Sequence, residues 1–189
     1  MNNEQLLQMY DAIRQQPDLL VKAAARKRLI NFARYMQPDL VLEPFHVVYY
    51  TLLDMFAHGK IRKMIVQQPP QHGKSEGSSR KLPAFMLGLD PDRKICIGSY
   101  AATIARDFNR DVQRIIDTPR YRELFPGTYL NGSNVVTMAN TYLRNSDVIE
   151  MVGRKGSLRV VGRGGSLTSK TVDVSILDDV YKDYAEGNS

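Results

Sequence analysis

Apolar positions follow a helical period from the start of the chain to about residue 58. A first expected helix ends at Pro17, a second runs from Asp18 to about Met36, and a third runs from Pro44 to Gly59. We therefore expect residues 1–58 to form a helical N-terminal segment.

From Ile61 onward, short β-branched runs alternate with helical patterns, which is typical of a largely parallel sheet with helices on its faces. The expected strands are Lys63–Gln67, Lys94–Ser99, Asp147–Val152, Ser157–Val161 and Val172–Leu177. Helices are expected at Gly73–Leu87 and Ala101–Asp117. Glycines in Gly153–Gly156 suggest that two of these strands form an inserted hairpin. Residues 59–189 are thus expected to form an α/β core.

The composition is that of a folded protein, since 43% of the 189 residues are hydrophobic and 24% are charged. The single cysteine, Cys96, excludes an internal disulfide and a cysteine-rich zinc site, and the 3 histidines are too scattered for a histidine metal cluster. Cysteine usage suggests a reducing, intracellular compartment. Because no stretch reaches the roughly 18 apolar residues of a membrane span, we expect no membrane partner.

The net charge of +6 is compatible with a polyanionic partner such as nucleic acid or nucleotide. Basic residues gather on the second expected helix at Lys22, Arg26, Lys27, Arg28 and Arg34. They form either a solvated face or a contact surface for a phosphate backbone. In the helix Ala101–Asp117, Arg110 and Arg114 each follow an aspartate by three residues, which predicts local ion pairs.

The segment Met64–Glu76 runs from an apolar strand through a tight loop and Gly-Lys-Ser into a helix, the arrangement of a phosphate-binding P-loop. Gly73 would let the backbone approach phosphates closely, so that loop amides point at the anion. Lys74 would reach the β- and γ-phosphates, and Ser75 would offer its hydroxyl to Mg²⁺. The other residues of the expected ATP-binding segment are Pro70, Gln71, His72 and Glu76.

The loop departs from the usual pattern, because Gln68 stands where the first glycine is expected. Gly-Lys-Ser alone also occurs in ordinary strand–turn–helix units with a surface lysine, and this alternative stays open. We expect His72 to shape the loop rather than to catalyse, since the other histidines do not cluster with it.

A second strand, Val172–Leu177, is followed by Asp178 and Asp179. Ligands bind at the carboxyl ends of strands in open α/β sheets. We expect Asp178 to hold Mg²⁺ through water, and Asp179 to point elsewhere and orient the attacking water, with Glu186 as a fallback. The alternative is an acidic helix cap. With the loop, this pair predicts an α/β fold of the P-loop NTPase type.

A glycine-rich loop, Gly162–Lys170, precedes that strand. It suits either a flexible loop near phosphate or DNA or a plain surface loop. Arg163 and Lys170 are both candidate charge stabilisers, and the sequence does not choose between them.

Taken in order, these segments resemble the large subunit of phage DNA-packaging terminases. The resemblance covers residues 40–189 and rests on the blocks Leu42–His46, Gln68–Glu76, Lys94–Tyr100 with Ala105 and Phe108, Gly162–Thr168, Asp173–Asp179 and Lys182–Asp183. It implies that His46 lies near the adenine of ATP, that Gln68–Glu76 is a Walker A loop, and that Asp173–Asp179 is a Walker B strand.

The resemblance implies an ATPase that uses ATP and Mg²⁺ to drive double-stranded DNA into a procapsid in the host bacterial cytoplasm. Lys74 and Asp179 would be its catalytic residues. The implied partners are a portal protein, a small terminase subunit and further copies of the chain in a ring. The family's nuclease domain and coupling motif are not found after Asp179, so we expect a truncated fragment.

The chain also departs from the family. Gln71 stands where relatives often have a basic residue, and His46 stands where they have glutamine. The alternatives are a helicase-like or other nucleic-acid-stimulated ATPase, a small-molecule kinase, and a catalytically silent module. Weak duplex binding through Arg26, Arg28 or Arg163 is expected in addition.

Overall fold

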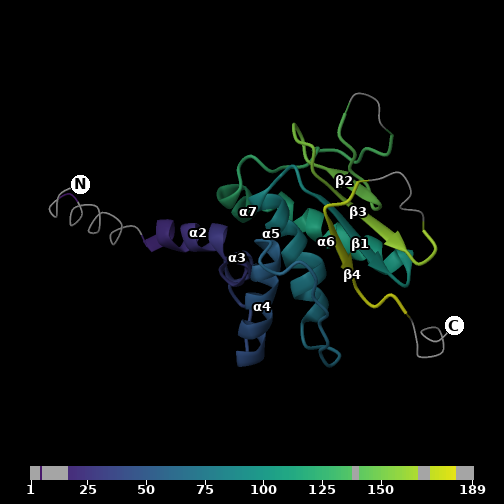
Figure 1. Ribbon diagram of the computed structural model, residues 1–189. Coiled ribbons are helices and arrows are strands. Elements are labelled where there is room, and N and C mark those ends of the chain that lie inside the picture. Colours follow the sequence, from purple (N-terminus) through teal and green to yellow (C-terminus); the bar gives the residue numbers. More distant parts are fainter. Residues whose placement is uncertain (1–4, 6–16, 138–140, 166–170, 182–189) are drawn as a thin grey trace.

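The computed structural model describes residues 5, 17–137, 141–165 and 171–181. Its centre is a four-stranded sheet with the order β2-β3-β1-β4 (Figure 1). The strands are β1 Lys94–Ser99, β2 Val148–Glu150, β3 Ser157–Gly162 and β4 Val174–Leu177. β1 pairs in parallel with β3 and β4, whereas β2 pairs antiparallel with β3. The expected α/β class, with a mostly parallel sheet and an inserted hairpin, is confirmed.

Helices α5 Leu82–Leu89, α6 Ala102–Asp117 and α7 Pro119–Leu124 flank the sheet. Helix α6 lies against β3 and β1. The approach is close, because a Cβ atom at Gly162 would come within 2.6 Å of the backbone nitrogen of Ala102. On the outer side of α6, Arg110 pairs with Asp107, and Arg114 pairs with Asp111 at 2.9 Å. The predicted local ion pairs are therefore present.

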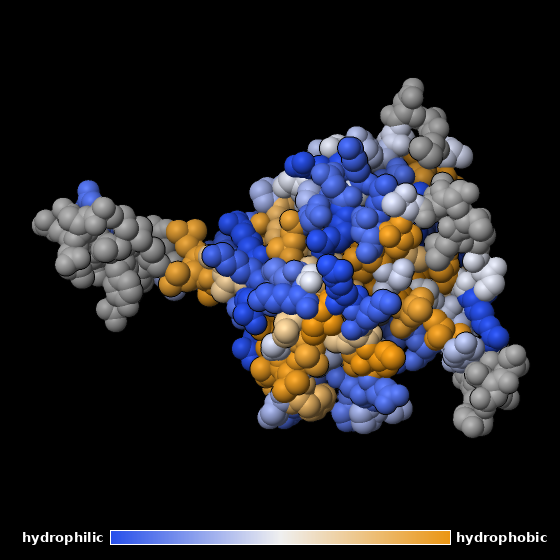
Figure 2. All heavy atoms as spheres, in the orientation of Figure 1, coloured by the Kyte–Doolittle hydropathy of each residue, from blue (hydrophilic) through white to orange (hydrophobic). Residues whose placement is uncertain are grey.

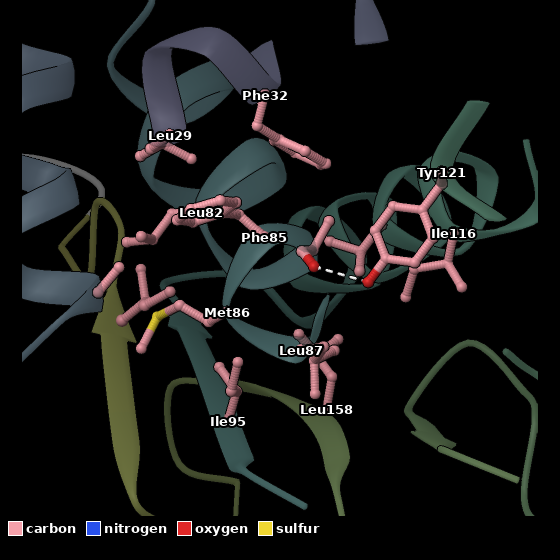
Figure 3. Packing of buried hydrophobic residues seen from close by; sticks show 14 of the residues in the cluster. Leu29, Phe32, Leu82, Phe85, Met86, Leu87, Ile95, Ile116, Tyr121 and Leu158 are labelled. Carbon is pink, nitrogen blue, oxygen red and sulfur yellow. Dashed lines mark hydrogen bonds between the residues drawn. The ribbon is translucent and has the colours of Figure 1, made fainter. Parts of the chain in front are cut away.

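The hydrophobic core joins the sheet to the helices on one side (Figure 3). Phe85 and Leu87 of α5 are fully buried, as are Ile95 of β1 and Leu158 of β3. Tyr121 of α7 donates a hydrogen bond of 2.8 Å from its hydroxyl to the carbonyl oxygen of Ala84, so its one polar atom is satisfied within the core.

The helix expected over residues 18–36 is two helices, α2 Pro17–Lys27 and α3 Leu29–Met36. Arg28 between them is extended, with φ −132° and ψ 127°. The break follows from Asp54, which is buried in α4 Pro44–Ala57. Its carboxylate accepts the backbone N–H of Leu29 at 2.7 Å and the Arg28 guanidinium at 3.0 Å. The single-helix prediction is wrong because a distant side chain caps α3. The third helix, α4, ends at Ala57, and the chain turns at Gly59, which has a φ of +71°.

The expected strand Lys63–Gln67 does not form. These residues are irregular, and the side chain of Ile65 is 91% exposed. Met64–Val66 lies opposite β4 across a hollow of about 630 Å³. A strand requires a neighbouring ladder of backbone hydrogen bonds, and none of the described strands pairs with this segment.

The helix expected at Gly73–Leu87 begins at Lys74 and runs to Leu89. Its middle is a π-helix, η1 Glu76–Lys81, in which the N–H of Leu82 donates to the carbonyl oxygen of Gly77. Such wide turns are rare and concentrate at functional sites.

Apolar side chains also lie on the surface, and one such group lies along α2 at the left of Figure 2. Leu19, Leu20 and Val21 are each about half exposed, whereas Ala25 of the same helix is fully buried. Within the ranges the structure describes, no helix combines the length and the apolar character that crossing a membrane requires.

Candidate functional site

The carboxyl ends of β1, β3 and β4 meet at one edge of the sheet because the three strands are parallel. Asp178 follows β4 directly, and its N–H donates to the carbonyl oxygen of Gly98 at 2.9 Å. The carbonyl oxygen of Asp179 accepts the N–H of Tyr100 at 3.0 Å. The backbone of the acidic pair is thus fixed to the end of β1.

Lys74, at the start of the helical run after the loop, reaches this acidic pair. Its Nζ donates to Asp179 Oδ1 at 2.5 Å and lies 3.5 Å from Asp178 Oδ1. Partial burial opposes the ammonium charge, but the bond to Asp179 and the charge of Asp178 outweigh it and raise the pKa of Lys74. The lysine is therefore a stable cation at this edge.

Asp178 and Asp179 differ in burial although they are neighbours. The side chain of Asp178 is 3% exposed, whereas that of Asp179 is 64% exposed. Ser79, also buried, donates its hydroxyl to Asp178 Oδ2 at 2.6 Å. Asp178 is therefore held from both sides, by Ser79 and Lys74. The two carboxylates do not diverge as expected, since both lie at Lys74.

The backbone at the site adopts rare left-handed conformations. Gln71, Gly73 and Asp179 have φ values of +62°, +74° and +47°. Such values suit glycine and are unfavourable for the other two residues, and strained residues of this kind cluster at functional sites. Gly73 is also approached closely, because a Cβ atom there would lie 3.4 Å from His46 Nε2.

The loop packs against the first turn of α4. His46 Nδ1 accepts the N–H of Glu43 at 3.0 Å, which turns the other edge of the ring toward Gly73. Phe45 lies between the two histidine rings, with centroids 3.9 Å from His46 and 5.6 Å from His72. Nδ1 of His72 lies 2.8 Å from the carbonyl oxygen of Pro70 in the same loop.

Tyr49 of α4 supports the first helical turn and was not expected from the sequence. Its hydroxyl donates to the carbonyl oxygen of Lys74 at 2.5 Å, and Ser78 donates to the same oxygen at 2.9 Å. Burial raises the pKa of Tyr49 to about 12, so the phenol keeps its proton. Gly77 makes this approach feasible, since a Cβ atom there would come within 2.6 Å of the Tyr49 ring.

Ser75 and Glu76, which follow Lys74, make no hydrogen bond to the acidic pair among the described residues. Ser75 makes no hydrogen bond to Asp178 in the described chain, whereas Ser79, one helical turn later, does. Glu76 faces Lys81 at 3.1 Å and Arg80 at 3.8 Å. The one sequence feature that could have pointed to Ser79 is its position four residues after Ser75, which places the two serines on the same side of a helix.

Arg163 lies just past β3 at the same edge of the sheet, where its guanidinium stacks 5.3 Å above the Tyr181 ring. Pro70 and Gln71 are exposed in the loop. Lys170 and Glu186 lie outside the described residues.

A divalent cation at this edge would depend on ligand oxygens and water. Among the residues that the structure describes, no three or more His, Cys, Asp or Glu side chains are placed to hold a metal ion alone. The buried hydroxyl of Ser99, at the end of β1, has no hydrogen-bond partner in the described chain. The buried carboxylate of Asp178 could hold a hydrated ion, since Mg²⁺ usually keeps several waters and adds substrate phosphates as ligands.

No protein-family model, curated protein or solved structure matches this chain.

Proposed function

We propose that this chain is the ATPase domain of a viral DNA-packaging motor of the large-terminase type, which binds and hydrolyses ATP with Mg²⁺ to move double-stranded DNA into a procapsid. The observation that carries the ATPase proposal is the meeting of Lys74 with Asp178 and Asp179 at the carboxyl edge of the parallel strands. P-loop enzymes that transfer phosphoryl groups use this arrangement. A lysine at the start of a helix faces carboxylates that follow a neighbouring strand.

Each residue then has a role that its surroundings support. Lys74 binds the terminal phosphates, and the loop around Gly73 offers backbone N–H groups to them. Ser75 and Asp178 would hold Mg²⁺, Asp178 through water, and the ion would neutralise charge that develops on the phosphates. Asp179, which is exposed, accepts a hydrogen bond from the attacking water and orients it.

The motor part of the proposal rests on the ordered resemblance in the sequence. The portal, the small subunit and a ring of copies are proposed partners on the same ground. DNA-stimulated phosphate release supports a motor, whereas phosphate transfer to a small acceptor without any effect of DNA supports a kinase.

The nucleotide site is tested by calorimetric titration of the chain with ATP and Mg²⁺. Lys74→Ala should weaken binding by about 2–5 kcal/mol, because it removes a charge-assisted contact from a partly buried site. Lys60→Ala is the matched control, since it removes the same charge from an exposed position. Equal affinities of the two variants for ATP would contradict the proposed site.

A further inference from the structure

A second hollow, of about 390 Å³, lies at the opposite edge of the sheet from Lys74. It is formed where β1 and β3 begin, since Lys94 and Ser157 are register partners at the first position of each strand. Arg154 and Lys155 of the β2–β3 turn also line it, as does Arg159 of β3. The hollow therefore shares no residue with the site described above.

The charges around this hollow are unbalanced. Four cationic side chains line it, and Glu150 is the one carboxylate among its lining residues. Glu150 Oε2 accepts the N–H of Leu143 at 3.0 Å, and its Oε1 lies 3.9 Å from Arg159. In the described part of the chain, the side chains of Lys94, Arg154 and Lys155 form no ion pair. The Asp173 carboxylate also accepts the backbone N–H of Lys94 at 2.8 Å. Cations still outnumber carboxylates on this concave surface, and such a surface attracts anions.

Two basic residues outside this hollow form contacts within the protein. Arg26 donates to the carbonyl oxygens of Leu124 and Glu123 at 2.8 Å each, and Arg28 pairs with the buried Asp54. These two arginines, which the sequence offers as part of either a solvated face or a phosphate contact surface, join helices. The unpaired cations of the hollow are thus better placed for an external anion.

The turn that carries Arg154 and Lys155 is held in place before any ligand binds. The N–H of Lys155 donates to Asp92 Oδ1 at 2.8 Å, and the N–H of Gly156 donates to the carbonyl oxygen of Pro91 at 3.1 Å. A Cβ atom at Gly156 would collide with that carbonyl oxygen, so the close contact requires glycine. A fixed backbone lowers the entropic cost of binding.

We propose that this hollow binds phosphate groups of a DNA duplex backbone, without reading sequence. Arg154 and Lys155 are exposed, so the site is open to an extended polyanion. Tyr142 is the one aromatic side chain among the lining residues, whereas single-stranded DNA is usually bound on several aromatic platforms. Phosphate contact alone therefore fits a duplex. The choice of DNA as the polyanion rests on the proposed function.

The test measures binding of a short fluorescent duplex by anisotropy across a salt series, without nucleotide. The double variant Arg154→Ala/Lys155→Ala should bind more weakly than the wild type, and its log–log salt slope should be shallower by about two, one unit for each lost phosphate contact. The matched control is Lys60→Ala/Arg62→Ala, which removes one lysine and one arginine from exposed positions and should keep the wild-type slope. The conservative pair Arg154→Lys/Lys155→Arg should also keep it.

Identical slopes for the double variant and its control would overturn the proposal. Displacement of the duplex by inorganic phosphate, at constant ionic strength, would assign the hollow to a free anion and also overturn it. The two proposals can be contradicted independently. Lys74→Ala should lose ATP binding but keep DNA binding, whereas Arg154→Ala/Lys155→Ala should lose DNA binding but keep ATP binding.

Discussion

Lys74 and Asp179 are 105 positions apart in the sequence, yet a hydrogen bond of 2.5 Å joins Nζ of the lysine to the carboxylate. The bond connects the first residue of the helical run to the second residue after β4. Asp179 is exposed, so solvent or a ligand can replace its carboxylate at Lys74. Asp178 is buried, so its carboxylate stays in place beside the lysine. Phosphates that bind Lys74 would compete with Asp179 rather than with Asp178.

This competition predicts different effects for the two acidic residues. Asp179→Asn should preserve or tighten ATP binding, because it removes a competitor for Lys74, and it should slow phosphate release. Asp178→Asn should weaken Mg²⁺-dependent binding, because it removes the buried negative charge. Titration with ATP in the presence and absence of Mg²⁺ measures the effects on binding, and an assay of released phosphate measures the effect on turnover. An equal loss of ATP affinity in the two variants would contradict this division of roles.

We expect Ser79 to contribute to the stability of the fold and Ser75 to contribute to nucleotide binding. Ser79→Ala removes the hydroxyl that donates to buried Asp178, so it should lower the free energy of unfolding by about 1–3 kcal/mol. Ser75→Ala should leave stability nearly unchanged and weaken Mg²⁺-dependent nucleotide binding. Urea denaturation and nucleotide titration separate the two. A stability loss confined to Ser75→Ala would reverse the assignment.

Asp54 should be a large single contributor to the stability of the helical segment. Asp54→Ala leaves the N–H of buried Leu29 without its acceptor and Arg28 without its partner. We expect the free energy of unfolding to fall by about 1–3 kcal/mol. Asp39→Ala, at an exposed position, is the control for urea denaturation. If both variants unfold at the same urea concentration, Asp54 does not cap α3.

The hydrogen bonds of Glu123 predict that the free energy of unfolding depends on pH. Hydrogen bonds from Lys22 at 2.8 Å and Tyr35 at 2.7 Å lower the pKa of Glu123 below its ordinary 4.5. A lowered pKa in the folded state means that the contribution is present above the ordinary value and is lost as pH falls through the folded value. The stability gap between wild type and Glu123→Gln should therefore be full at neutral pH and disappear in strong acid. A gap that widened in acid would contradict the sign.

The sequence by itself determined the order and kind of most elements. Strands β1 and β3 begin where apolar, β-branched runs predict them, and α4 and α6 follow their helical periods. The Gly-Lys-Ser loop and the acidic pair were also visible, because glycine, lysine and a carboxylate pair at a strand end are local signals. Hydrophobic periodicity and turn-forming residues act over a few neighbouring positions, so they can be recognised in the sequence without knowledge of the tertiary structure.

The tertiary structure decided which groups meet. Asp54 breaks the expected helix at Arg28, and Ser79 rather than Ser75 meets Asp178. Lys63–Gln67 has strand-forming residues but no ladder partner among the described strands. The cations of the second hollow come from the starts of two strands and one turn. These outcomes depend on hydrogen bonds, ion pairs and packing between residues far apart in the chain, and local sequence patterns carry no information about such pairs.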